Sequence, residues 1–309
     1  MNSTGSLDHS SQMSAYSEWV SNVITWVFLF FTVLCFCFFL LFITITLIVY
    51  FTASHAREAT RYVLFAHMLV CDTLYLCLGL FLALAYQFLY MSVPICYFVL
   101  VITGTTFRVT PYNLAAMALE RYIAICYPLR HIMFCTVERS YSVISAMWLL
   151  GFLPNAFDLI ILATVAEKSF FSKTLLCRQE GLIVQPIQDT IRSLTFIISL
   201  IVVALVILFT YVKVMLIARK SGSNSSSASK AGRTVILHAF QLLLCIVSLT
   251  SNITESYGGN YMGRLNFLVF MCFPRLLSPL IYGIRDELFI KYIRKMYSTA
   301  YKDRTVQKF

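Results

Sequence analysis

Residues 117–131 read MALERYIAICYPLRH, and this stretch constrains the fold more than any other part of the chain. Three residues within it, Glu120, Arg121 and Tyr122, come at the end of a long apolar segment. An ionised arginine is costly inside a bilayer, so such a group lies at a water boundary or faces the interior of a protein. The stretch therefore predicts the end of a membrane-spanning helix, with Glu120 and Arg121 paired at the membrane surface.

The composition of the whole chain agrees with a membrane protein. Hydrophobic residues make up 59% of the 309 positions and charged residues 12%, whereas soluble proteins have about 45–50% and about 25%. The sequence contains none of the metalloprotease, nucleophile-elbow, P-loop or dinucleotide motifs that mark common enzymes. It therefore predicts neither an enzyme nor a cofactor.

Seven apolar runs divide the chain, and each is long enough for the roughly 20 residues that a spanning helix needs. They cover residues 23–50, 62–86, 93–119, 141–163, 190–218, 234–253 and 265–284. Of the 24 Lys and Arg residues, 17 lie on one side of these runs, five lie on the other, and Arg108 and Arg275 lie within runs. Because short loops rich in Lys and Arg stay in the cytosol, the N-terminus is predicted to be extracellular.

This topology divides the chain into three parts. Residues 1–22 are predicted to form an extracellular N-terminal segment and residues 23–285 an all-α bundle of seven transmembrane helices. Residues 286–309 are predicted to form a short amphipathic cytoplasmic helix and a tail. Apolar residues on one side of that helix and basic residues on the other are typical of a helix lying on anionic lipid. The net charge of +10 would suggest nucleic acid in a soluble protein, but the distribution of Lys and Arg around the spans follows the positive-inside rule instead. Membrane lipids are therefore an expected partner and nucleic acid is not.

Two stretches resemble a known family. Residues 117–131 are similar to the MAYDRYVAIC-PL signature of vertebrate odorant receptors, with Glu120 in place of Asp, and residues 277–286, LSPLIYGIRD, resemble that family's NPIIYSLRN. The resemblance implies a rhodopsin-like G-protein-coupled receptor in the plasma membrane, with a fish-type odorant receptor as one option. Such a receptor binds a small odorant inside the helix bundle and activates a heterotrimeric G protein that raises cyclic AMP.

Ten cysteines are present, and by the predicted topology only Cys96 and Cys177 face outward. The family has a disulfide cysteine at the same spacing from its arginine as Cys96 has from Arg121. We therefore expect Cys96 and Cys177 to form a disulfide that fixes the second extracellular loop to the third helix. Asn2 opens an Asn-x-Thr sequon in the predicted extracellular segment, where it is expected to be glycosylated.

Four residues of the third run are predicted to contact the ligand, and by resemblance their shared helix face lines the odorant pocket. They are Thr103, Gly104, Phe107 and Arg108. Arg108 lies twelve residues after Cys96, which is about 18 Å along the helix and into the membrane, where a guanidinium needs compensation. Asp158, an anionic ligand and backbone carbonyls are the alternatives left open.

The resemblance assigns roles to two further groups. The first is the switch that couples to the G protein, in which Glu120 restrains Arg121 at rest. It comprises Glu120, Arg121, Tyr122, Tyr211 and Tyr282. The second is a polar network inside the bundle, comprising Asp72, Ser278 and Arg275. In many relatives the aspartate binds sodium, but here Arg275 is expected to lie near Asp72, neutralise it and compete with that ion.

Two alternatives to an odorant receptor remain, one within the same receptor class and one outside it. A non-olfactory rhodopsin-like receptor, for another small molecule or a peptide, is the main alternative. A transporter or channel is less consistent with the sequence, because transporters are typically built from internal repeats. No internal repeat is found, and seven spans do not divide into two equal halves.

Overall fold

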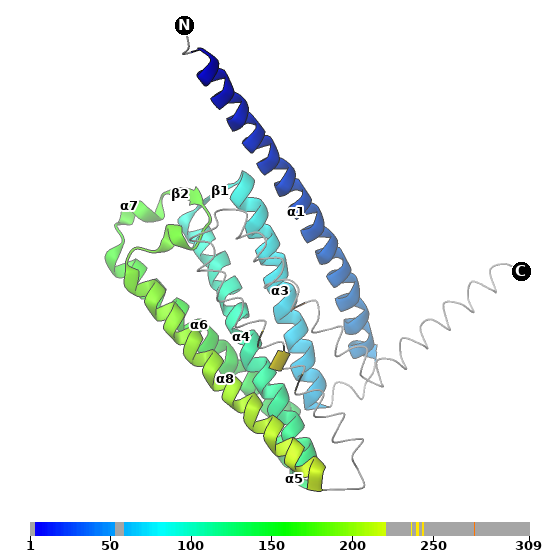
Figure 1. Cartoon of the computed structure of the whole chain (residues 1–309). Helices are drawn as coiled ribbons and strands as arrows, with labels where there is room; N and C mark the ends of the chain where they lie inside the picture. Colours follow the sequence, from blue (N-terminus) through cyan, green and yellow to red (C-terminus); the bar gives the residue numbers. More distant parts are fainter. Residues whose placement is uncertain are drawn as a thin grey trace, which may run out of the picture.

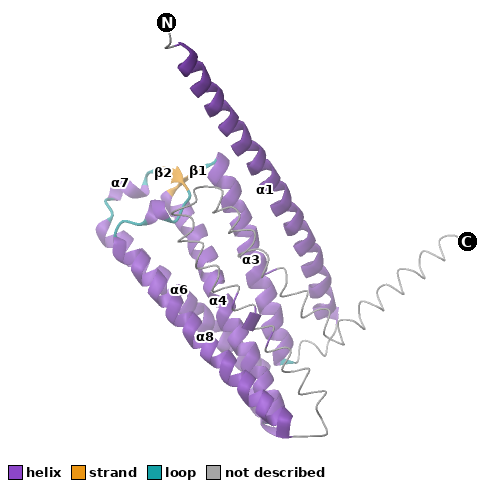
Figure 2. Ribbon diagram, viewed as in Figure 1, coloured by secondary structure: helices purple, strands orange, loops and turns teal. Residues whose placement is uncertain are grey.

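The computed structural model describes residues 4–52 and 59–220, together with the isolated positions 236, 239, 240, 243 and 275. Within these residues the chain is almost entirely helical (Figures 1 and 2). The elements in chain order are α1 (Thr4–Thr52), α3 (Thr60–Phe88), β1 (Tyr90–Ser92), α4 (Val93–Cys126), α5 (Pro128–Phe134), α6 (Val137–Val165), α7 (Lys168–Phe171), β2 (Thr174–Leu176), a 3-10 turn (Glu180–Leu182) and α8 (Pro186–Lys220).

Five helices in the described part of the chain are long and apolar enough to cross a membrane. Their apolar spans are Asn22–Thr52, Thr60–Ala85, Val93–Cys126, Val137–Val165 and Pro186–Ile217. These spans confirm the prediction of an all-α, multi-pass membrane protein. The predicted sixth and seventh spans, apart from five isolated positions, and the amphipathic helix after residue 285 lie outside the described residues, as do Asn2, Ser278 and Tyr282.

The first helix is longer than expected. It begins at Thr4 and continues without a break to Thr52, whereas residues 1–22 were predicted as a separate segment. The apolar part of this helix nevertheless begins at Asn22, close to the predicted boundary. Hydropathy thus located the apolar span, but it carried no information on whether the polar residues before it continue the same helix.

Helix α4 lies at the centre of the described bundle and packs against α3, α6 and α8. Buried side chains from all four helices meet in one cluster around α4. They include Met68, Leu114, Met147, Leu200 and Val203. A second buried cluster joins α1 to α3 through Phe39, Ile43 and Leu69. The residues predicted to bind ligand therefore lie on the helix with the most neighbours.

A histidine links three of these helices through polar contacts. Trp148 Nε1 on α6 donates to His67 Nε2 on α3 at 2.9 Å. His67 Nδ1 lies 3.3 Å from Asn113 Oδ1 on α4, and Asn113 Nδ2 donates to the carbonyl of Leu64 at 3.0 Å. Because Nε2 accepts from Trp148, the remaining proton of a neutral ring sits on Nδ1 and points to Asn113. These bonds fix the relative rotation of α3, α4 and α6.

Gly151 allows α4 and α6 to approach each other closely. A Cβ atom placed there would lie 2.9 Å from Val109 Cγ2 and 3.3 Å from the carbonyl oxygen of Thr105. Any larger residue would push the two helices apart. This close approach holds Asn155 and Asp158, one and two turns further along α6, against α4.

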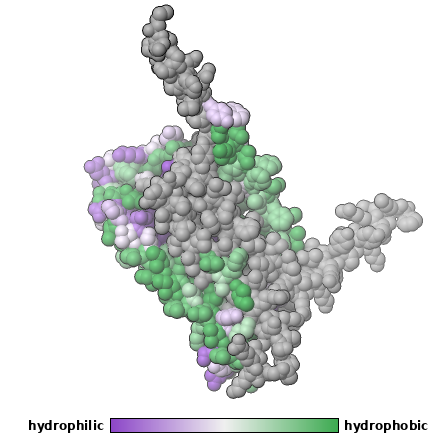
Figure 3. Space-filling model, in the orientation of Figure 1, coloured by the Kyte–Doolittle hydropathy of each residue, from purple (hydrophilic) through white to green (hydrophobic). Residues whose placement is uncertain are grey.

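The outer surface of the bundle is apolar, as expected for helices in lipid. Trp26 is 65% exposed, Leu149 72% and Leu205 60%, and these residues come from three different spans. Figure 3 shows apolar side chains along the length of the visible helices, with hydrophilic residues gathered at the two opposite ends. A soluble protein would not expose so continuous an apolar surface.

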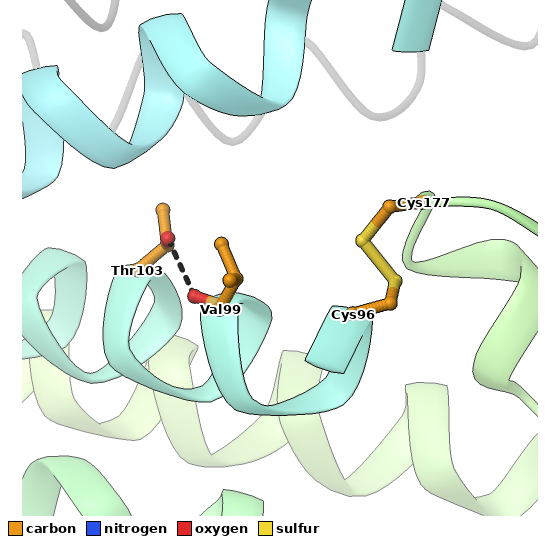
Figure 4. The surroundings of a disulfide bond; sticks show 4 residues. All are labelled: Cys96, Val99, Thr103 and Cys177. Atoms are coloured by element: carbon orange, nitrogen blue, oxygen red, sulfur yellow. Dashed lines mark hydrogen bonds between the residues drawn. A yellow bond between two sulfur atoms is a disulfide. The ribbon is translucent and has the colours of Figure 1, made fainter. Parts of the chain in front are cut away.

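One end of the bundle is closed by a disulfide, and we call it the disulfide end. Cys96 at the start of α4 is bonded to Cys177, as predicted, and both residues are buried (Figure 4). Beside them β1 and β2 form an antiparallel pair with Tyr90 opposite Leu176. These two strands of three residues each were not predicted, because segments this short show no clear alternation of polar and apolar residues.

The other end carries α5, and we call it the α5 end. Here Thr60 Oγ1 at the start of α3 donates to the carbonyl of Cys135 at 2.7 Å. Thr136 caps α6 by accepting a hydrogen bond from the backbone N–H of Arg139 at 3.3 Å. The segment between α4 and α6 is therefore anchored against α3 and has a fixed place below the bundle.

The disulfide gives a first testable prediction. Replacing Cys177 with Ser should reduce the amount of protein at the cell surface, because a disulfide contributes about 2–4 kcal/mol and this one joins residues 81 positions apart. Surface labelling relative to total protein measures the effect. Cys37→Ser, at an exposed free cysteine, is the matched control and should behave as wild type. Free thiols at both Cys96 and Cys177 in surface protein would contradict the assignment.

Candidate functional site

A buried ion pair lies in the interior of the bundle. Arg275 Nη1 donates to Asp72 Oδ1 at 2.7 Å, and Asp72 is fully buried while Arg275 is 4% exposed. Thr110 on α4 contacts both partners, since its hydroxyl lies 3.4 Å from Asp72 Oδ1 and 3.3 Å from Arg275 Nη1. The structure therefore brings together two of the three residues of the predicted polar network, and Ser278 lies outside the described residues.

Two aromatic rings also contact the Arg275 guanidinium. Its central carbon lies 3.7 Å from the centre of the Tyr75 ring and 5.7 Å from that of Phe107. A cation above an aromatic face is stabilised by the ring quadrupole, by about 2 kcal/mol when the pair is desolvated. The carboxylate, the hydroxyl and the two rings together explain how the bundle tolerates this cation.

The four predicted ligand residues do not all face the same part of the bundle. Phe107 packs between Tyr75 and Phe196, at centroid distances of 5.7 Å and 5.0 Å. Gly104 instead faces Arg108 and Asn155, since a Cβ atom there would lie 3.5 Å from Arg108 Nη1. The set therefore divides into an aromatic group toward α3 and α8 and a cationic group toward α6.

The hydroxyl of Thr103 makes a hydrogen bond within its own helix. It donates to the carbonyl of Val99 at 2.8 Å, one turn toward the disulfide (Figure 4). The oxygen can still accept a hydrogen bond. Thr103 is half-buried and lies between the disulfide and the rest of the predicted ligand residues.

Arg108 is not compensated by Asp158 directly, which corrects one of the alternatives drawn from the sequence. Arg108 Nη1 donates to the amide oxygen of Asn155 at 3.3 Å. Asp158 instead accepts a short hydrogen bond from Nε of Arg192 on α8. Asp158 pairs with Arg192 and not with Arg108, because helix α8 faces it. The sequence gives no information on how two apolar helices are rotated toward each other.

The predicted switch residues meet at the α5 end. Glu120 is buried, and its Oε2 lies 3.8 Å from Nε of Arg121. Its other oxygen, Oε1, lies 3.1 Å from Nε2 of His131 on α5. The carboxylate is thus shared between its own helix and α5. His131 was not predicted as part of this group, although its place in the same stretch of sequence could have suggested it.

Two tyrosines of the predicted switch have different surroundings. Tyr122 makes edge-to-face contacts with Tyr127 and with Phe209 on α8, at centroid distances of 5.8 Å and 5.5 Å. Tyr211, also on α8, packs against the central apolar cluster. Together they join the α5 ends of α4 and α8 beside Arg121.

The described residues contain no cluster of three or more His, Cys, Asp or Glu side chains that could hold a metal ion. The carboxylate of Asp72 is paired with Arg275. The charges of this pair are held in the buried interior of the bundle.

Comparison with known proteins identifies the family. A family model described as the seven-transmembrane receptor of the rhodopsin family matches residues 43–257. Odorant receptor 131-2 of zebrafish (Danio rerio) is 29% identical over 264 residues, which cover 82% of this chain and 81% of the relative. Human olfactory receptor 6K3 is 23% identical over 195 residues, covering 60% of this chain and 57% of the relative.

A receptor outside the olfactory group also matches. Cholecystokinin receptor type A of the guinea pig (Cavia porcellus) is 33% identical over 112 residues, covering 35% of this chain and 26% of the relative. Receptors of this family are not enzymes, in agreement with the prediction. The chain belongs to the rhodopsin family of seven-transmembrane receptors and is similar to odorant receptors along most of its length.

Proposed function

We propose that this protein is an odorant receptor that binds a small molecule among its helices and activates a heterotrimeric G protein, raising cyclic AMP. The observation that carries the proposal is the position of Arg121. This arginine is held by Glu120 at the α5 end, on the same helix whose opposite end is fixed by the disulfide. The similarity to a zebrafish odorant receptor over 82% of the chain supports the olfactory role.

A ligand would act through α4. The predicted ligand residues and the Glu120–Arg121 pair lie on this one helix, from Thr103 to Arg121. Ligand that binds the active arrangement better shifts the population of receptors toward it. In that arrangement Arg121 separates from Glu120 and contacts the G protein, with Tyr211 and Tyr282 as its neighbours.

The receptor would reside in the plasma membrane with its disulfide end outside. The N-terminus, with a glycan on Asn2, would be extracellular, and the α5 end and residues 286–309 would face the cytosol and its anionic lipids. The ligand pocket then opens toward the medium. The Arg108 guanidinium on this side favours ligands that carry an acidic group.

The alternative is a rhodopsin-family receptor for a non-olfactory ligand. The match to a cholecystokinin receptor favours it, but that match covers 35% of this chain. A panel of odorants against cells expressing the receptor, read as cyclic AMP, separates the two. Responses to volatile or water-borne small molecules support the olfactory role. Responses only to peptides, or to none of the small molecules, count against it.

The switch predicts opposite effects at neighbouring positions. Arg121→Ala should abolish ligand-driven cyclic AMP while the receptor stays at the surface, because the side chain acts in the contact with the G protein. Glu120→Gln should raise ligand-independent cyclic AMP, because a neutral amide restrains Arg121 less strongly than a carboxylate. Both are measured at matched surface levels. Wild-type responses from the Arg121 variant would overturn the proposed role of this residue.

The buried ion pair predicts a non-additive effect on folding. Asp72→Asn or Arg275→Gln should each greatly reduce surface receptor, since an unpaired buried charge costs about 3–5 kcal/mol. The double variant should recover much of the loss, because it buries no charge. Lys173→Gln, at an exposed cation, is the control.

The same pair predicts insensitivity to sodium. Arg275 already supplies a positive charge to Asp72, so replacing sodium with a large organic cation in the medium should leave ligand potency unchanged. A clear shift in potency of the wild-type receptor between the two media would contradict this assignment.

A further inference from the structure

We propose that Arg108 and Arg192 form a binding site for the carboxylate of the ligand, so that the natural agonists are small organic acids. The inference rests on the proposed function and names the chemical class that the pocket recognises. Arg108 lies on α4 and Arg192 on α8, and α6 contributes Asn155 and Asp158 between them. This group of four is called the arginine cluster.

The arginine cluster has one positive charge in excess. It contains two guanidinium groups and one carboxylate, and Asp158 makes its ion pair with Arg192. Asp158 is 1% exposed, and the side chain of Arg192 is 11% exposed. Arg108 donates to Asn155, which lies one turn before Asp158 on α6, and it pairs with neither Asp158 nor Arg192. An uncompensated cation among helices is costly, so an anion that enters would be stabilised.

The donors that an anion requires are present. The bond from Arg108 to Asn155 is long, at 3.3 Å, and an amide oxygen carries no net charge. In the described part of the chain, Nη1 of Arg192 is buried and has no hydrogen-bond acceptor. Guanidinium groups bind carboxylates through two parallel N–H bonds. Two such groups with unused donors therefore form a site for a carboxylate.

Asn155 is held rigidly, so that it orients Arg108 without neutralising it. Its Nδ2 donates to Thr105 Oγ1 at 2.9 Å, and its backbone carbonyl accepts a hydrogen bond from Tyr97 at 2.7 Å. The amide oxygen therefore faces Arg108 in a fixed position. This arrangement positions the guanidinium before any ligand arrives, which lowers the entropy cost of binding.

Gly104 leaves space beside the guanidinium. A Cβ atom there would lie 3.5 Å from Arg108 Nη1 and 3.8 Å from Asn155 Oδ1, so a methyl group would fit in direct contact with the cation. On the neighbouring side of α4, the rings of Phe107 and Phe196 lie 5.0 Å apart. The surroundings thus suit a molecule with an acidic head and a small apolar body.

The test compares each acid with its own methyl ester. Cells expressing the full-length receptor are exposed to short aliphatic and aromatic carboxylic acids and to the matching esters, and cyclic AMP and surface level are measured. The wild-type receptor should respond to acids at concentrations at least about 10-fold lower than to esters, since hydrogen bonds to charged groups are the stronger ones.

Variants then test which residues cause the preference for acids over esters. Arg108→Gln should reduce the potency of acids by about 10- to 100-fold, and the potency of any active ester should change far less. Arg108→Lys keeps the charge but cannot form the paired bonds, so it should have an intermediate effect and serves if the Gln variant does not reach the surface. Gly104→Ala keeps both arginines and should selectively weaken the bulkier acids.

Two outcomes would overturn the inference. Neutral compounds could activate the wild-type receptor while acids do not, or Arg108→Gln and Arg108→Lys could reach the surface and respond to acids normally. Either result would leave the proposed receptor function standing. Failure of the receptor function itself is distinguishable, because then no compound would act and Glu120→Gln would not raise cyclic AMP.

Discussion

The buried pair of Asp72 and Arg275 is the interaction on which the centre of this receptor depends. Neither charge could remain alone in a membrane interior. Their contact at 2.7 Å offsets the cost of burying both charges only because other groups interact with the pair as well. Thr110 supplies a hydroxyl, and the face of the Tyr75 ring covers the guanidinium at 3.7 Å. The counter-charge of Asp72 is thus a side chain of the protein itself.

Phe107 lies between this ion pair and helix α8. The ring lies within 5.7 Å of the Arg275 guanidinium and within 5.0 Å of Phe196 on α8, while its neighbour Arg108 faces α6. A ligand that displaces Phe107 would therefore act on the contacts of Arg275 as well as on α8. Because cores pack at high density, such a ring has few alternative positions. Phe107 is thus a single side chain that links the predicted ligand residues to the ion pair.

The features of the fold that depend on charge and hydropathy could be predicted from the sequence. It located the five described spans, the cysteine pair, and the intramembrane charges Asp72, Arg108 and Arg275, since each is conspicuous in an apolar run. It did not identify Arg192 as the partner of Asp158, nor His131 as a partner of Glu120. Both depend on how helices are rotated and how α5 folds back, and a span that is apolar on all sides has no amphipathic pattern to fix its rotation. The strands β1 and β2 were missed because three residues are too few for a pattern.

Three charged groups follow one another along α4, and their charge balance differs. At the α5 end the carboxylate of Glu120 pairs with Arg121 and also contacts His131, and in the middle of the bundle Asp72 pairs with Arg275. Between α4, α6 and α8, Arg192 pairs with the carboxylate of Asp158, whereas Arg108 donates to the neutral amide of Asn155. Balanced pairs hold helices together and can separate only at a cost, whereas an unbalanced group attracts a counter-charge from outside. Arg108 lies next to Phe107 on α4, so the site proposed for a ligand adjoins the Asp72–Arg275 pair, and the Glu120–Arg121 pair lies further along the same helix at the α5 end.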